Sequence, residues 1–419
     1  MKKKILLKGP LLTRSGYGEQ ARFALRALKS REDLFDIFIQ PLQWGQTSWL
    51  SAVDDDRAWI DYTIEKTIAY AQQGGKFDIS IQVTIPNEWE KIANVNIGYT
   101  AGIETTKVAP LWVQKANEIT DKIIVVSNHS KNIYEKTQVM AVDDSGKQIE
   151  YPLKTPIDVV NYPVKNYEKL NELELNVETD FNFLSVAQFG PRKNMPNTIR
   201  WFVEEFADEP NVGLVIKSNI AKNCLMDREH MLSELKNLLK EAPARQCKVY
   251  LLHGDMTDEE MHSLYKHPKM SALLTLTHGE GFGLPPFEAA YSGLPVIATG
   301  WSGQLDFLVD EKKKSRFYNV AFDLQPVQKE VVWKDVLIAE SMWAYARTQS
   351  AKDKMRECYN DIINNTEGTP AALSCEYAEE LKERFSEQKM YAQFVSCLGV
   401  EEEIEAMKSE VEDLLSDLL

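Results

Sequence analysis

One stretch decides the fold of this chain: Thr277-His278-Gly279-Glu280-Gly281-Phe282-Gly283-Leu284-Pro285-Pro286-Phe287-Glu288-Ala289. The short apolar run from Met270 to Leu276 precedes it and predicts a buried parallel strand. The two prolines suit the first turn of a helix, where a missing N–H group costs nothing. The order is therefore strand, glycine loop and helix. This order is typical of an α/β protein that binds ligands beyond the carboxyl ends of its strands.

The loop itself predicts a phosphate site. Gly281 and Gly283 let the backbone turn tightly and approach a ligand, and the free N–H groups of the new helix favour an anion. Glu280 precedes the turn, and we expect Glu288 in the first helical turn, so both can accept hydrogen bonds from hydroxyls of one bound molecule. Phosphate and polyol together describe a nucleotide sugar. The alternative is that both glutamates are solvated acids beside a structural turn.

The segment resembles the E-x7-E signature of retaining glycosyltransferases with the GT-B fold, family 4 in particular, and the residues from Tyr291 to Thr299 are similar to the next strand of that family. The resemblance implies an α/β protein with two Rossmann-like domains that face each other across a cleft. It implies that Glu280 contacts the donor sugar and Glu288 the ribose. It also implies that the diphosphate is bound by loop amides, those of Gly281, Phe282, Gly283 and Leu284.

A second anion site is predicted at Arg192 and Lys193, which follow a strand and come at the start of a helix. Taken alone, the pair is equally well read as solvated cations. The segment resembles the pyrophosphate-binding loop of the family, with Lys193 in place of the family lysine. Arg192 supplies the charge that the family often places where this chain has Gln188.

Further donor contacts are predicted beyond the next two strands. Lys217 ends one strand, and the segment containing Gly254 and Met256 resembles the part of the family that borders the nucleobase. Asp258 is interpreted as a helix cap.

Composition is that of a globular protein. With 419 residues, 44% of them hydrophobic, the chain has room for two domains. No apolar run approaches the ~20 residues of a membrane span, and Lys8 interrupts the apolar start. The five cysteines lack a C-x-x-C pair, which favours reduced thiols in a cytoplasmic protein. The run Asp54-Asp55-Asp56 is interpreted as solvated surface acids and not as a metal-binding motif, so we expect no metal. The nucleotide sugar is the expected donor substrate, and no other cofactor is expected.

Short apolar runs alternate with helical or loop segments in two blocks, which predicts a parallel sheet in each. The polar interval from Lys165 to Asp180 is the expected linker. We therefore predict an N-terminal Rossmann-like acceptor domain over residues 1–170, a C-terminal nucleotide-sugar domain over 171–370, and C-terminal helices over 371–419. The first of these helices is expected to pack back on the N-terminal domain. The expected strands are Ile5–Leu7, Ile37–Ile39, Ile79–Val83, Val95–Tyr99, Lys122–Val126, Val159–Val160, Phe183–Val186, Gly213–Ile216, Val249–Leu252, Leu273–Leu276 and Val296–Ala298.

The first half offers candidate acceptor residues in three loops that follow strands. The loop from Gly9 to Glu19 resembles the first glycine loop of the family, which approaches the donor phosphates and the acceptor. The second loop lacks the histidine that many family members have there. The candidates are Gly16 for the donor and Arg14, Tyr17, Glu104, Thr105 and His129 for the acceptor.

Charge leaves the acceptor open. Residues 1–31 hold nine Lys or Arg and one acid, a net charge of +8, although the whole chain carries −15. The first loop is also similar to those of phage-encoded glycosyltransferases, some of which modify hydroxymethylated bases in DNA. The expected acceptor is therefore a saccharide or DNA with hydroxymethylated bases. The enzyme is expected to be a hexosyl- or pentosyltransferase. Two rivals are a sugar-nucleotide epimerase of the same fold and a non-catalytic sugar-nucleotide-binding module.

The last residues form an apolar seam at helical spacing, with an acidic opposite face. Residues 401–419 hold eight Asp or Glu and one Lys. The seam predicts either a homo-oligomer through this helix or a final helix packed along its own domain. Its apolar positions are Val400, Ile404, Met407, Val411, Leu414 and Leu418.

Overall fold

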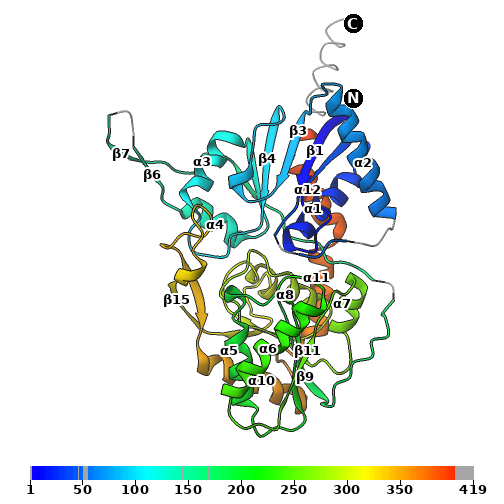
Figure 1. Ribbon diagram of the computed structural model, residues 1–419, viewed down its shortest axis with the longest axis vertical. Coiled ribbons are helices and arrows are strands. Elements are labelled where there is room, and N and C mark those ends of the chain that lie inside the picture. The colour runs from blue at the N-terminus through cyan, green and yellow to red at the C-terminus, as the bar shows by residue number, and fades with distance from the viewer. Residues whose placement is uncertain (1, 46, 51–54, 143–144, 168, 402–419) are drawn as a thin grey trace, which may run out of the picture.

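Two parallel β-sheets of six strands each organise the protein, one in each half of the chain (Figure 1). A computed structural model describes residues 2–45, 47–50, 55–142, 145–167 and 169–401. The predicted apolar tail from Ile404 onward lies outside the described residues. The two halves stand one above the other, and the last helices run alongside both.

The first sheet has the strand order β2-β1-β3-β4-β5-β8. Its strands are near-continuous apolar runs, as expected where helices cover both faces of a sheet. All five residues of β3 are buried, and Ile5 in β1 pairs with Ile37 on one side and Ile79 on the other. The strands are β1 Lys3–Gly9, β2 Phe35–Pro41, β3 Ile79–Val83, β4 Val95–Thr100, β5 Lys122–Val125 and β8 Ile157–Val159.

The second sheet repeats this arrangement with the order β11-β10-β9-β12-β13-β14. The strand β9 lies inside it, and Leu184 pairs with Val215 of β10 and with Leu273 of β12. The α/β prediction and the GT-B architecture are confirmed. The strands are β9 Phe181–Val186, β10 Val212–Lys217, β11 Lys248–Leu252, β12 Ala272–Thr275, β13 Val296–Thr299 and β14 Tyr318–Val320.

Helices connect the strands and enclose the cores. In the second half α5 packs against α10, and Phe202 and Phe206 of this region form ring contacts with Phe183 of β9. The helices are α1 Gly16–Lys29, α2 Asp55–Gln72, α3 Pro110–Ile119, α4 Asn128–Lys136, α5 Met195–Glu205, α6 Leu225–Glu241, α7 Asp258–Tyr265, α8 Leu284–Tyr291, α9 Leu305–Leu308, α10 Thr348–Ile363, α11 Ser374–Arg384 and α12 Glu387–Ser396.

The C-terminal helices divide between the halves in an order that corrects the prediction. The first, α11, packs on α8 of the second half, and it is α12 that packs on α1 of the first half. The reason is the aromatic pocket around Phe23 of α1, which takes Tyr391 and Phe394 at centroid distances of 5.8 and 5.5 Å. Both of these rings belong to α12.

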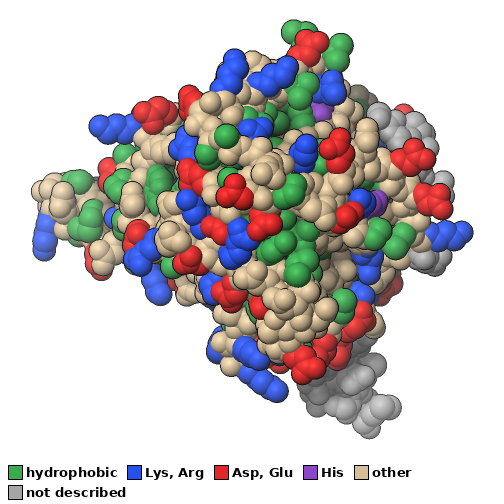
Figure 2. All heavy atoms as spheres, turned by 90° about the horizontal axis from the view of Figure 1, so that it is seen from below, with side chains coloured by type: hydrophobic (Ala, Val, Ile, Leu, Met, Phe, Trp, Pro, Cys, Tyr) green, Lys and Arg blue, Asp and Glu red, His purple; other side chains and the backbone are tan. Residues whose placement is uncertain are grey.

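Two antiparallel hairpins were missed from the sequence. One is formed by β6 Met140–Val142 and β7 Gln148–Glu150, and the other by β15 Phe322–Pro326 and β16 Met342–Ala346. The exposed residues of β6, β7 and β15 do not form the buried apolar runs that identify the parallel strands, whereas β16 is such a run and was overlooked. The end of the second half away from the first has acidic and basic side chains intermixed over its surface (Figure 2).

The two halves meet through glycines of the loop after β12. A methyl group on Gly281 would lie 1.9 Å from the carbonyl oxygen of Ala101, and one on Gly279 would lie 2.1 Å from that of Glu104. Ser127 of the first half also donates a hydrogen bond to the carbonyl of Gly281 at 2.6 Å. The close approach allowed by Gly281 is therefore to the backbone of the other half. Gly283, in contrast, is required for the turn, because its φ is +98°.

Gly281→Ala is expected to hold the two halves apart, since the added methyl cannot fit against Ala101. Small-angle X-ray scattering should show a larger radius of gyration than for the wild type. Gly190→Ala is the matched control, because its methyl would meet nothing within 4 Å. Equal radii for the two variants would contradict this account of the contact.

Candidate functional site

A cavity of about 900 Å³ lies between the halves, at the carboxyl ends of the strands of both sheets. Every residue that the sequence analysis placed in the site, except His129, lines it. From the first half these are Arg14, Gly16, Tyr17, Glu104 and Thr105; from the second they are Arg192, Lys193, Lys217, Gly254, Met256, Glu280, Gly281, Phe282, Gly283, Leu284 and Glu288.

A cluster of charged side chains, with Glu280 buried and its partners partly buried, lines this cavity. Lys193 Nζ lies 2.6 Å from one oxygen of the Glu280 carboxylate, and Arg192 Nη1 lies 3.0 Å from the other. Arg192 also reaches across the cleft to Glu104 of the first half, at 3.0 Å, and donates to the carbonyl of Gly279 at 2.6 Å. One guanidinium therefore connects both carboxylates and both halves.

The electrostatics of the cluster differ from one member to the next. Burial raises the pKa of Glu280, but Lys193 and Arg192 outweigh it and hold the pKa at about 2. The pKa of Lys193 is lowered by burial and by Arg192. Burial raises the pKa of Glu104. Glu104 forms its ion pair with Arg192, the same cation that contacts Glu280. The two cations thus sit in a low-dielectric site where another anion would bind them strongly.

Local structure fixes the position of both cations. They belong to a short 3-10 turn, Pro191–Lys193, and α5 begins only after it, at Met195. The expectation that the pair starts the helix is therefore corrected. Asn194 separates the two elements in a left-handed conformation with φ of 52°, and its side-chain amide donates to the carbonyl of Leu276. This bond ties the turn to the end of the strand that leads to Glu280.

The start of α8 presents backbone donors to the same space. Gly283 is the N-cap residue, and the two prolines that follow Leu284 have no N–H group to offer. Within the described residues the amides of Phe282, Gly283 and Leu284 have no hydrogen-bond partner. These three N–H groups line the cavity at the positive end of a helix, an arrangement suited to phosphate.

Glu288 lies deeper along α8, in its second turn and not in the first turn as predicted, since the helix begins at Leu284. Its carboxyl accepts a hydrogen bond from the Tyr265 hydroxyl at 3.0 Å. Burial raises the pKa of Glu288 to about 7, with Asp258 and Glu19 adding to the effect and Lys165 opposing it. Glu288 can therefore change charge near neutral pH.

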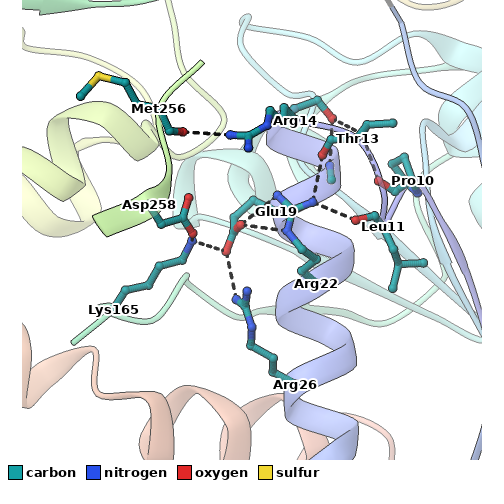
Figure 3. A network of polar contacts seen from close by, with 12 residues as sticks. Pro10, Leu11, Thr13, Arg14, Glu19, Arg22, Arg26, Lys165, Met256 and Asp258 are labelled. Atoms are coloured by element: carbon teal, nitrogen blue, oxygen red, sulfur yellow. Dashed lines mark hydrogen bonds and ion pairs between the residues drawn. The ribbon is translucent and has the colours of Figure 1, made fainter. Parts of the chain in front are cut away.

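An ion-pair network around Lys165 joins the halves through the linker (Figure 3). Lys165 of the linker contacts Glu19 of α1 at 2.8 Å and Asp258 of α7 at 2.7 Å. Arg22 and Arg26 complete the shell of Glu19, at 3.1 and 3.2 Å. Burial raises the pKa of Glu19, but Lys165 and the two arginines outweigh it and hold that pKa below its usual range.

The same region corrects the expected cap of α7. Thr257 is the N-cap residue and forms a capping box with Glu260, whereas Asp258 is the first helical residue and pairs with Lys165. Thr257 holds this place because its hydroxyl accepts the amide proton of Glu260.

The loops at the far end of the second sheet carry the residues expected near a nucleobase. Lys217 donates to the carbonyl of Gly254, and burial lowers the pKa of Lys217. Arg14 of the first half donates to the carbonyl of Met256 at 2.9 Å and lies 3.7 Å from Asp255. The guanidinium of Arg14 therefore contacts the loop of the second half that contains Asp255 and Met256.

In the first half, Tyr17 organises the loop that carries Glu104. Its hydroxyl bonds to Thr100 at 2.7 Å and accepts from the amide of Gly102 at 3.2 Å, which fixes the loop that carries Glu104. His129 was wrongly placed in the site: its ring packs edge-on against Trp301 at 4.9 Å, outside the cavity wall. Burial lowers the pKa of His129 to about 4.

Sequence reasoning missed several residues of the cavity wall. Asp227 accepts the amide protons of three consecutive loop residues, at 2.7 to 3.0 Å, and contacts His253 at 2.8 Å. Two of those loop residues, Ile220 and Ala221, line the cavity. Trp44 and Trp333 also line it, from opposite halves. The sequence analysis found polar site residues by their position in loops that follow parallel strands. Trp333 lies between the two strands of a hairpin, so this criterion could not find it.

The described residues offer neither a metal site nor a membrane-spanning helix. Among them no group of three or more His, Cys, Asp or Glu side chains is arranged to hold a metal ion. No helix in the described ranges is both long and apolar enough to cross a membrane.

Comparison with known proteins shows which sequences resemble this one. Residues 167–319 match the family model of glycosyl transferases group 1. An alpha-1,3/1,6-mannosyltransferase of Mus musculus is 25% identical over 208 residues, 48% of this chain and 48% of that protein. A serotype-specific mannosyltransferase of Escherichia coli is 26% identical over 204 residues, 45% of this chain and 22% of that protein. The matched region thus spans about half of the first relative and about a fifth of the second.

Solved structures resemble the whole fold. A sucrose-phosphate synthase from Thermosynechococcus elongatus has a TM-score of 0.58 at 11% identity, over 97% of this chain and 100% of that one. A glycosyltransferase from Rickettsia africae has a TM-score of 0.57 at 12% identity, over 95% of this chain and 98% of that one. An Anabaena protein crystallised with UDP and glucose has a TM-score of 0.55 at 12% identity, over 95% of this chain and 99% of that one. At these identities the likeness establishes the GT-B fold alone.

Replacing Arg192 and Lys193 together by alanine is expected to weaken binding of a nucleoside diphosphate roughly 10²-fold or more, since each removes a charge-assisted hydrogen bond. Isothermal calorimetry with UDP and GDP measures the change. The control is Arg228→Ala with Lys236→Ala, which removes the same charges from exposed positions of α6. Equal affinities in both double variants would remove the pair from the binding site.

Glu288→Gln tests the raised pKa. Because the folded-state pKa of about 7 exceeds the usual 4.5, folding is favoured while the group is protonated and this advantage is lost as pH rises from about 4.5 to 7. The stability of Glu288→Gln relative to the wild type should therefore increase over that window and level off above it. Urea unfolding at a series of pH values measures the difference. The exposed Glu229→Gln should show no such trend, and a flat difference for Glu288→Gln would contradict the assignment.

Proposed function

We propose that this protein is a retaining glycosyltransferase that moves a hexosyl group from a nucleoside-diphosphate sugar to a hydroxyl of a saccharide. The proposal starts from the match of its second half to glycosyl transferases group 1 and from its GT-B fold. The observation that carries it is the cluster of Arg192, Lys193 and Glu280 beside the free amides at the start of α8.

The donor fits this cavity in one direction. A nucleobase would lie near Met256 and Arg14, and the ribose hydroxyls near Glu288. The diphosphate would take the amides of Phe282 to Leu284 together with both cations. A hexose is favoured because the named relatives are mannosyltransferases and the Anabaena structure holds glucose with UDP.

The arrangement supports departure of the diphosphate. Breaking the glycosidic bond creates negative charge on the leaving group and oxocarbenium character on the sugar. Arg192 and Lys193 stabilise the negative charge on the leaving diphosphate, because both cations are already fixed and need no reorganisation. When the diphosphate engages them, the Glu280 carboxylate can accept hydrogen bonds from the hydroxyls of the sugar. The leaving phosphate then accepts the proton of the attacking acceptor hydroxyl.

A saccharide is the better acceptor on the charges seen here. The cations that suggested DNA are paired: Lys8 with Glu90, Lys29 with Asp56, Arg31 with Asp33, and Arg22 and Arg26 with Glu19. Arg14 is engaged by the loop of Met256. These pairs leave few free charges for a phosphate backbone, and activity that is insensitive to salt would accord with this choice.

Two other activities would use the same donor site. An epimerase would release an altered sugar when given the donor alone, and a binding module would hold the donor without turnover. Product analysis of each nucleotide sugar, with and without a mixture of oligosaccharides, separates the three. Transfer that requires the oligosaccharide supports the proposal.

Glu280→Gln is expected to lower transfer by roughly 10²-fold or more, because it removes one preorganised polar contact to the sugar. Nucleoside diphosphate should bind at least as tightly as to the wild type, since Arg192 and Lys193 lose a competing carboxylate. Initial rates and calorimetry measure the two effects. A variant with wild-type turnover would exclude Glu280 from the reaction.

A further inference from the structure

A hairpin of the second half bridges the cleft to the first half. The strands β15 and β16 are joined by residues 327–341, which reach the loops after β3 and β4 (Figure 1). The side-chain amide of Asn87 donates to the carbonyl of Asp335 at 3.0 Å, and Thr106 exchanges two hydrogen bonds with Met342, at 2.9 and 3.2 Å. The first half therefore contacts this segment at its tip and at the start of β16.

The tip itself is a tight and rigid turn. Trp333 and Leu337 exchange backbone hydrogen bonds at 3.0 and 2.8 Å, and Val336 donates to the Trp333 carbonyl at 3.0 Å. Asp335 closes the turn in a left-handed conformation with φ of 61°. Val336 and Ile338 pack against the main hydrophobic core. The backbone that carries Trp333 is thus anchored on both flanks.

The indole of Trp333 is left uncovered inside the cavity. The residue is 60% exposed, although it lines the cavity together with Val336 and Leu337. Among the described residues no ring packs against it. A large aromatic face that is exposed at a cavity wall and fixed in place is typical of a ligand contact.

The surroundings define the kind of ligand. Ile85, Thr105 and Lys107 of the first half line the same cavity, and Lys107 has no ion pair among the described residues. Glu104, the residue before Thr105, contacts Arg192, which in turn contacts Glu280. The indole of Trp333 and the ammonium group of Lys107 therefore line the same cavity as the proposed point of transfer. The Thr105 hydroxyl donates to the carbonyl of Lys107 at 2.8 Å, so it can meet a ligand as a hydrogen-bond acceptor.

We infer that Trp333 is an acceptor subsite that stacks on the apolar C–H face of a pyranose ring, while Thr105 and Lys107 meet the hydroxyls on the rim of that ring. This inference rests on the proposed function and specifies the acceptor as a saccharide. The rigid turn holds the indole before binding, so little conformational entropy is lost on contact with the sugar. The residue determines acceptor affinity and leaves the donor site unchanged.

The test uses the full chain and two probes, methyl α-D-mannopyranoside and methyl α-D-glucopyranoside. Saturation-transfer NMR and titrations, with and without UDP, give their dissociation constants. Trp333→Ala is expected to weaken binding of the better glycoside roughly tenfold, and Trp333→Phe should restore much of it. Tyr62→Ala is the matched control, because Tyr62 is an exposed aromatic residue of α2 that does not line the cavity. UDP affinity should be the same in all four proteins.

The outcomes separate this inference from the proposed function. Wild-type glycoside affinity in Trp333→Ala would overturn the subsite, as would failure of the wild type to bind either glycoside. Stronger Trp333-dependent binding of thymidine than of both glycosides would assign the platform to a nucleobase and overturn the saccharide. If the wild type binds neither UDP nor GDP, the proposed function fails, while Trp333-dependent glycoside binding would still establish a sugar site.

Discussion

The contact between Arg192 and its two carboxylates is the interaction on which the rest of the site depends. Arg192 lies 3.0 Å from Glu280 of its own half and 3.0 Å from Glu104 of the other. Taking such charges out of water costs free energy, and the cost is offset only while each charge has a partner. The cluster is therefore expensive to maintain for stability alone. In the proposed function, the cluster holds the cations fixed where a diphosphate would replace a carboxylate.

This exchange of partners requires that the two halves come close. Gly279 and Gly281 permit the approach, because neither could carry a methyl group against the loop from Ala101 to Glu104. The linker contributes a second charged contact, in which Lys165 joins α1 to α7. Both contacts line the cavity between the halves, so binding of the proposed donor there would be coupled to the arrangement of the halves. The hairpin tip with Trp333 adds a third contact between the halves.

Much of the fold could be predicted because parallel strands that are buried on both faces are written as continuous apolar runs. The runs at Ile79–Val83 and Val296–Ala298 are examples, and the cavity wall followed from the polar residues at their ends. In the hairpin β15–β16, β15 was missed because its residues alternate and are mostly exposed, whereas β16 is an apolar and mostly buried run that the sequence analysis passed over. His129 was misplaced because a position after a strand does not reveal which way a side chain turns.

The sequence by itself determined the α/β architecture, the strand–glycine loop–helix unit around Glu280 and the residues that could meet a nucleotide sugar. These are local properties, since they depend on apolar periodicity and on the backbone freedom of glycine and proline. The tertiary structure alone decided which distant charges are paired: it joined Arg192 to Glu104, brought Lys165 to Glu19 and placed Trp333 at the cavity. Those partners are 88 to 146 residues apart or lie on different elements, and the energy of a charge depends on burial and distance, which only the folded chain fixes.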